Sequence, residues 1–248
     1  MDIEKGLFFN PEEERKVVNM EINDQRKEAD PRLREALKDE LLLMNFESTS
    51  DRIYRFFGNF SETDPSNIKI QIADGQFGTG EAKNSTIIVK APDTNSLFYD
   101  ILEKLQEGHF NVPENKLEET AGKLILSTMC STILHESCHA LLNSKPGSKF
   151  SEKLKELSGS EYREEDSTLL DEGLAYAIQG FYAPEIEYIG SLKPRVNEND
   201  REIVKKRKIL GEKMLPKVEE YIGKGKPLDD NFLLFSVQKM SEIKDQNP

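Results

Sequence analysis

Residues 124–144 read LILSTMCSTILHESCHALLNS, and they contain a single formally charged side chain, Glu136. Two of the three histidines of the protein, His135 and His139, lie beside it. The run predicts a long apolar helix over residues 118–143, ended by the NSKPG segment that follows. A buried carboxylate without a partner is costly, as are buried imidazoles without one. A divalent cation would compensate the acid and bind both histidines.

The five residues from His135 to His139 spell H-E-x-x-H. On a helix, side chains four residues apart lie on one face, about 6 Å apart along the axis, so both imidazoles can converge on one ion. Glu136 is rotated by about 100° from His135, where it can take a proton from a metal-bound water without ligating the metal. Zn²⁺ suits this site because it accepts nitrogen and oxygen ligands and lowers the pKa of its water to about 7. The motif therefore predicts a zinc site with Glu136 as general base.

A catalytic zinc usually has a third protein ligand. No histidine follows His139, and Lys145 stands where H-E-x-x-H-x-x-G-x-x-H would need one. His109 lies upstream in a predicted loop, and Cys138 is about 100° away from the histidine face of the helix. A carboxylate is therefore expected. The next apolar helix carries LLDEGLAYAIQG, residues 169–180, in which a glycine that permits close helix approach follows Glu172.

H-E-x-x-H followed by E-G-x-A on a second helix resembles the gluzincin class of zinc metallopeptidases, which includes thermolysin and the large aminopeptidase families. Residues 170–175, LDEGLA, are similar to the Leu-Asn-Glu-Gly-Phe-Ala segment of the aminopeptidase branch. The resemblance implies a zincin-like core with His135, His139 and Glu172 as ligands and Glu136 as general base. It also implies a strand along which a peptide substrate binds, here expected at residues 80–83 or 86–89.

The sequence departs from that class in two respects. The Gly-x-Met-Glu-Asn signature that holds a free amino terminus in aminopeptidases is missing, so that specificity is not predicted. Tyr176 replaces the aspartate that follows the third ligand by four residues in thermolysin. Asp171 is expected on another helix face, so the acid that orients a ligating imidazole has to come from elsewhere. Since relatives stabilise the oxyanion with a tyrosine or histidine, a tyrosine is expected here. The candidates are Tyr188, which is preferred, Tyr176 and Tyr182, and then Tyr162 and Tyr221.

Elsewhere, apolar spacing near 3.6 predicts helices, while Ile68, Ile70 and Ile72 alternate with polar residues as in a half-buried strand. The predicted strands cover residues 68–73 and 85–90, and residues 149–165 are expected to be irregular or partly helical. Asp166 or Ser167 is expected to cap the helix that carries Glu172. The predicted helices are residues 11–22, 31–46, 49–60, 93–108, 118–143, 166–182, 197–222 and 229–243.

The predicted class is α+β and predominantly α. A helical region, residues 1–60, is expected to pack on a zincin-like domain, residues 61–248. In that domain a small mixed or antiparallel sheet precedes the H-E-x-x-H helix (61–145), and a helical lobe follows (146–248).

The 248 residues carry a net charge of −12, which argues against nucleic acid or an anionic membrane as a partner, since both need a basic surface. No secretory signal or membrane-length apolar run is visible, so a cytoplasmic protein is expected, with signal-independent export left open. Cys130 and Cys138 lie about 12 Å apart on one helix. Since a disulfide needs Cα atoms within about 7 Å, both are predicted to be buried free thiols of a reducing compartment.

These features predict a zinc-dependent hydrolase of peptide bonds, an endopeptidase acting on a peptide or protein. One alternative is a metal-binding interaction module that has the peptidase fold but no turnover, because fold does not fix function. Another is a metal-free helical interaction protein.

Overall fold

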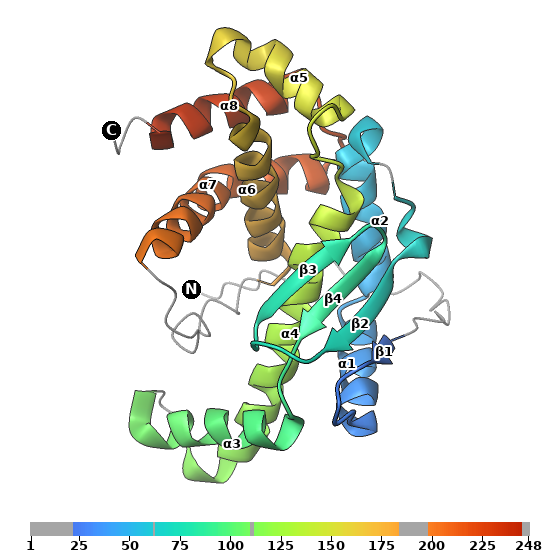
Figure 1. Ribbon diagram of the computed structural model, residues 1–248, viewed down its shortest axis with the longest axis vertical. Helices are drawn as coiled ribbons and strands as arrows, with labels where there is room; N and C mark the ends of the chain where they lie inside the picture. Colours follow the sequence, from blue (N-terminus) through green and yellow to red (C-terminus); the bar gives the residue numbers. More distant parts are fainter. Residues whose placement is uncertain (1–21, 62, 110–111, 184–197, 245–248) are drawn as a thin grey trace.

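A small sheet lies against one long helix, and further helices cover the rest of that helix (Figure 1). The computed structural model of the chain describes residues 22–61, 63–109, 112–183 and 198–244. The strands are β1 (Ile22–Asp24), β2 (Lys69–Ala73), β3 (Thr79–Lys83) and β4 (Thr86–Lys90). The helices are α1 (Pro31–Leu43), α2 (Phe46–Phe57), α3 (Thr94–Lys104), α4 (Leu117–Leu141), α5 (Lys149–Ser158), α6 (Glu164–Tyr182), α7 (Glu198–Gly223) and α8 (Asp230–Lys244).

The sheet is mixed, with the strand order β1-β2-β4-β3. β1 and β4 each pair with β2 in parallel, and β3 pairs with β4 in antiparallel orientation at one edge. Both predicted strands are present as β2 and β4, and alternate isoleucines of β2, Ile70 and Ile72, face the core. The predominantly helical class with a small sheet before the central helix is therefore confirmed.

The all-helical prediction for residues 1–60 is wrong at β1. Ile22, the last residue of the predicted helix 11–22, begins this strand, and residues 11–21 lie outside the described part of the chain. Ile22 pairs with Ile70 and is buried. Its conformation is set by this pairing with a distant strand, which outweighs local helical spacing.

Most predicted helices are confirmed, and the differences lie at their ends. The predicted helix over residues 31–46 stops at Leu43 because Asn45 has a left-handed backbone, with φ of 50°. Asp93 caps α3 by accepting a hydrogen bond from the Ser96 backbone N–H at 2.7 Å. Asp166 does not cap α6: it lies inside the first turn and accepts from the Arg163 backbone N–H at 3.0 Å. Residues 149–165 are partly helical, as expected, because they include α5.

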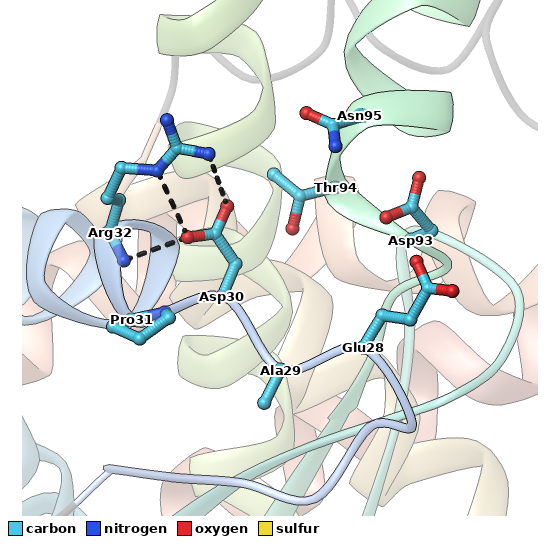
Figure 2. A pocket seen from close by; sticks show the side chains of 8 residues that line it. All are labelled: Glu28, Ala29, Asp30, Pro31, Arg32, Asp93, Thr94 and Asn95. Atoms are coloured by element: carbon cyan, nitrogen blue, oxygen red, sulfur yellow. Dashed lines mark hydrogen bonds and ion pairs between the residues drawn. The ribbon is translucent and has the colours of Figure 1, made fainter.

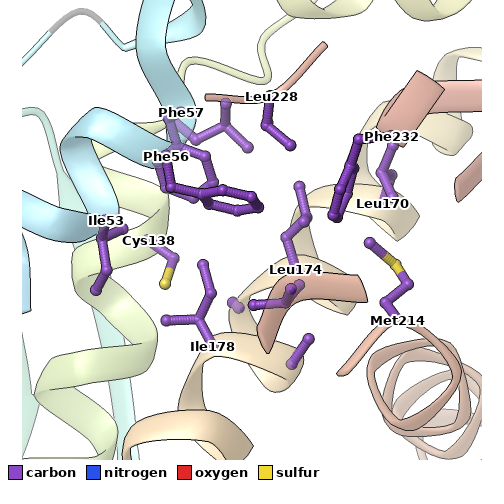
Figure 3. Packing of buried hydrophobic residues seen from close by; sticks show 14 of the residues in the cluster. Ile53, Phe56, Phe57, Cys138, Leu170, Leu174, Ile178, Met214, Leu228 and Phe232 are labelled. Carbon is purple, nitrogen blue, oxygen red and sulfur yellow. The ribbon is translucent and has the colours of Figure 1, made fainter. Parts of the chain in front are cut away.

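Helix α4 joins two hydrophobic cores. On one side Met129 and Ile133 pack with the sheet residues Ile70 and Val89. On the other side Leu134, Cys138 and Leu141 belong to a helical core formed by α2, α5, α6, α7 and α8, part of which is drawn in Figure 3. Burial on both sides explains why the run 124–144 has no polar face.

The two cysteines follow this division. Cys130 belongs to the core next to the sheet, and Cys138 belongs to the helical core. Both are free and buried, as predicted, and burial raises the pKa of each thiol.

The N-terminal helices α1 and α2 both contact α4. The ring of Phe56 at the end of α2 lies 5.4 Å from that of Phe232 on α8, edge to face. The division at residue 60 stays a prediction. Among the described residues, no helix combines the length and the apolar character needed to cross a membrane.

A buried ion pair ties β1 to the segment that precedes α3. The side chain of Arg26 is 0% exposed and binds both carboxylate oxygens of Asp24, at 2.9 and 2.7 Å. Its remaining Nη1 donates to the Pro92 carbonyl at 2.9 Å and contacts Thr94 Oγ1 at 3.1 Å. The guanidinium is thus fully engaged, and it links the Asp24 carboxylate to the backbone before α3.

Replacing Arg26 with Met is expected to lower the free energy of unfolding by about 3–5 kcal/mol, because it leaves the Asp24 carboxylate buried without a counterion. Urea denaturation measures this difference. The matched control is Arg34→Met, which breaks a solvent-exposed pair with Glu35 (side chains 43% and 60% exposed) and should cost no more than about 1 kcal/mol. Equal losses in the two variants would contradict a structural role for the buried pair.

Candidate metal centre

His135 and His139 lie one turn apart on α4, and their side chains point to the same place. Their Nε2 atoms are 3.2 Å apart, and the ring planes meet edge to face with centroids 4.9 Å apart. Both side chains are largely shielded from solvent, with 13% and 18% exposed. The helical spacing of the motif thus brings the two imidazoles together, as predicted.

Glu172 reaches the same place from α6, which packs against α4. Its Oε2 lies 3.6 Å from Nε2 of His135. The donor atoms of His135, His139 and Glu172 all lie within 4.8 Å of one another, and within the described residues this is the one group of three or more such side chains that could hold a metal ion. The crossing of the two helices is set by the helical core, to which Leu134, Leu170 and Leu174 contribute.

Two of the donor distances match those expected around one zinc ion. Two ligands held about 2.0–2.1 Å from one zinc in tetrahedral geometry are ~3.3 Å apart. The nitrogen–nitrogen distance of 3.2 Å and the nitrogen–oxygen distance of 3.6 Å are both close to that value. Two imidazoles and a carboxylate are also the ligand types of catalytic zinc sites, which leave a fourth position open.

The other ring nitrogen of each histidine has its own partner. His139 Nδ1 lies 3.0 Å from Asp171 Oδ1, and Ser144 Oγ donates to the second oxygen of Asp171 at 2.6 Å. His135 Nδ1 lies 3.3 Å from Gln179 Oε1, and the amide nitrogen of Gln179 donates to Ser131 Oγ. These contacts hold both rings with Nε2 facing the shared position.

The expectation that Asp171 faces away and that the orienting acid comes from elsewhere is wrong. Asp171 does lie on a different face of α6 from Glu172, but an imidazole can be approached from both of its nitrogens. Glu172 therefore approaches Nε2 of His135, and Asp171 approaches Nδ1 of His139 one turn further along α4. Gln179 was missed altogether, although Glu172, Tyr176 and Gln179 follow helical spacing along one face of α6, which is a usable signal.

Glu136 lies between α4 and the edge strand of the sheet. It is 8% exposed, and Gly80 of β3 stands directly over it: a Cβ built on Gly80 would lie 2.7 Å from both Glu136 Cγ and Thr132 Cγ2. Burial raises the pKa of Glu136, and the nearby His135 and His139 oppose that rise. The general base expected from the motif is thus next to the two histidines and next to a strand edge.

Electrostatics favour a cation at this centre. Desolvation lowers the pKa of His139, but Asp171, Glu172 and Glu136 outweigh it and raise the pKa to about 9. Desolvation likewise raises the pKa of Glu172, while both histidines and Arg207 hold it below its usual range. Without a metal, these acids favour a proton on His139, and a bound divalent cation would replace that proton.

Arg207 on α7 is a further residue at this centre that the sequence did not reveal. Its Nη1 lies 2.9 Å from Oε1 of Glu172. Nothing in the residues around Arg207 marks it, because the contact depends on how α7 crosses α6.

Of the predicted tyrosines, Tyr176 lies beside the candidate metal centre. Its ring lies 4.7 Å from that of His135, and burial raises the pKa of its hydroxyl to about 12. The hydroxyl of Tyr162 bonds to Ser167, and that of Tyr221 donates to Asp229. Tyr182 packs against the helical core with its hydroxyl buried. Tyr188, the preferred candidate, lies outside the described residues.

Another concave region lies away from the candidate metal centre and involves none of its residues. A pocket of about 330 Å³ lies between the start of α1 and the start of α3, and Figure 2 shows its polar lining. Asp30 and Asp93 cap these two helices through backbone N–H groups of Arg32 and Ser96. Helix capping accounts for the acidic character of this pocket.

A scan against protein-family models, a search of curated proteins and a search of solved structures found no match to this chain. The resemblance to gluzincins therefore depends on the residues of two helices and on their arrangement.

Proposed function

We propose that this protein is a zinc-dependent peptidase that cleaves within peptide chains. The observation that carries the proposal is the convergence of His135, His139 and Glu172, whose donor atoms lie within 4.8 Å of one another, with two of the distances near those of a tetrahedral ion. The contacts of Asp171 and Gln179 to the outer nitrogens support it, since ligating histidines usually have such partners.

His135, His139 and Glu172 would hold the ion, and Glu136 would handle the proton. When bound, zinc supplies a Lewis acid that polarises the peptide carbonyl and lowers the pKa of water. Glu136 takes a proton from the attacking water as the new bond to the carbonyl carbon forms. It then passes that proton to the leaving nitrogen as the carbon–nitrogen bond breaks.

The substrate proposed for this site is an extended peptide paired with β3. Strand β3 is an edge strand, and it contacts α4 beside Glu136. A peptide that paired with this edge as an additional strand would run beside Glu136, the proposed general base. Because the signature that binds a free amino terminus is missing, cleavage is expected inside the peptide.

Gly80→Ala is expected to lower kcat/KM by about 100-fold, the scale of a misplacement near 1 Å in an active site. The backbone of Gly80 does not have a positive φ, so the cost comes from the new methyl group, which collides with Glu136 and Thr132. Zinc content should not change, because no ligand is touched.

Gly122→Ala on α4 is the matched control for this prediction, since a Cβ there meets nothing within 4 Å. Peptide cleavage and bound zinc are measured for both variants. Parental cleavage by Gly80→Ala would show that the strand does not define the position of Glu136.

The test of the proposed function pairs metal content with cleavage profiling. Protein purified without chelator is expected to hold about one zinc per chain. On a peptide library made from a whole proteome, it should produce internal cuts that Glu136→Gln does not produce. Protein without zinc would overturn the proposal.

A metal-binding module without turnover is the second candidate. A peptidase of this kind needs a group that stabilises the oxyanion, and three of the predicted tyrosines are engaged elsewhere. These are Tyr162, Tyr182 and Tyr221. Zinc at one per chain with no cleavage of the library would favour this candidate.

A further inference from the structure

The two oxygens of Glu172 make two different contacts. Oε2 faces His135 Nε2 at 3.6 Å, on the side of the candidate ion, whereas Oε1 lies 2.9 Å from Nη1 of Arg207. A carboxylate whose second oxygen is held by a guanidinium has one oxygen left for a metal. Carboxylates without such a partner can bind an ion through one oxygen or two.

The ion pair of Glu172 and Arg207 is largely shielded from solvent. The side chains of Glu172 and Arg207 are 18% and 27% exposed, so their attraction is screened less than that of a surface pair. Arginine stays charged at all working pH values, and its planar group fixes the direction of the contact. The contact therefore constrains the carboxylate as well as compensating its charge.

The crossing of α6 and α7 holds the two partners in place. A Cβ on Gly211 would lie 2.6 Å from Tyr176 Cβ and 3.1 Å from both Ala177 N and Gly173 O. Gly211 thus brings the backbone of α7 directly against that of α6. Arg207 lies one turn before Gly211 on α7, and Glu172 is next to Gly173, so the closest approach of the helices is beside the pair.

We infer that Arg207 is a positioning residue that limits Glu172 to ligation through one oxygen. In doing so it keeps coordination positions free for water and for the substrate carbonyl, which a catalytic zinc requires. This inference rests on the proposed zinc peptidase function. Arg207 acts through Glu172 and need not touch the substrate.

The test uses the full-length protein loaded with Co²⁺ in place of zinc, because the absorption of Co²⁺ reports coordination number. Four-coordinate Co²⁺ absorbs more strongly than five-coordinate Co²⁺, and geometry is diagnostic of the site. Arg207→Met is expected to weaken the visible bands and to lower kcat by about 10–100-fold, the usual effect of losing a partner of a ligand. Arg207→Lys keeps the positive charge but loses the planar guanidinium, so its band intensity and kcat should lie between those of the parent and those of Arg207→Met.

Two control variants, Lys205→Met and Gly223→Ala, and one further test variant, Gly211→Ala, separate this effect from general loss of charge or packing. Lys205→Met removes one positive charge from an exposed position of the same helix and should leave spectrum and kcat at parental values. Gly211→Ala pushes α7 away without removing the guanidinium, so it should shift the spectrum as Arg207→Met does. Gly223→Ala, where a Cβ meets nothing, should not.

Each outcome decides one question. A parental spectrum and kcat in Arg207→Met would overturn the inference while leaving a zinc-binding parent intact. An unchanged spectrum with a lower kcat would also overturn the inference, because it would show that Arg207 acts on the substrate and not through Glu172. A parent protein that binds neither Co²⁺ nor zinc would overturn the proposed function itself.

Discussion

Glu136→Gln is expected to lower kcat for peptide hydrolysis by about 10²–10⁴-fold, the range measured when a general acid–base group is lost. Gln has nearly the same shape as Glu, so it can occupy the narrow space beneath Gly80 and beside Thr132. It cannot take a proton from the attacking water. The ligands His135 and His139 remain in place, and bound zinc should stay at the parental level.

The experiment compares single-turnover cleavage and zinc content in parent and variant. Glu118→Gln is the matched control, because Glu118 is exposed near the start of the same helix and far along the chain from the motif. It should cleave at the parental rate. If Glu136→Gln cleaved as well as the parent, another group would have to be the base.

The second large effect is expected for His139→Ala. Losing a residue that only hydrogen-bonds to a metal ligand typically reduces metal affinity by about 10–100-fold, and loss of the proposed ligand itself should reduce zinc affinity by more than that. The variant removes one of three donors, and the Nε2 that lies 3.2 Å from that of His135 is lost with it. Competition with a coloured chelator measures the affinity.

A graded series makes this prediction sharper. Asp171→Asn keeps all three ligands but weakens the contact at Nδ1 of His139, so it should cost about 10–100-fold in affinity. Cys138→Ala changes the residue next to His139, but Cys138 belongs to the helical core and should leave affinity unchanged. Equal affinity in His139→Ala and Cys138→Ala would mean that zinc binds elsewhere.

Local patterns predicted much of the site. Helical spacing alone places His135 and His139 on one face of α4, and the acid on the following helix was assigned from the pattern around Glu172. The two histidines meet as predicted because the distance between residues four apart on a helix does not depend on the rest of the fold. The strands β2 and β4 were also predicted, from alternation in their sequences.

The parts that were missed depend on contacts between elements. β1 is a strand because Ile22 pairs with Ile70, and no periodicity is visible in three residues. Asp171 does lie on a different face of α6 from Glu172, as helical spacing predicts. The prediction missed that Asp171 can still contact a histidine through the second ring nitrogen, Nδ1 of His139.

The sequence by itself determined the long buried helix and the shared face of His135 and His139, because both follow from spacing within one element. Only the tertiary structure decided which groups contact the outer nitrogens of these histidines and the second oxygen of Glu172. Arg207 meets Glu172 because α6 and α7 cross closely, with Leu210 packed on Gly173 and Gly211 packed on the backbone of α6. Two glycines on separate helices carry no such information until the helices pack.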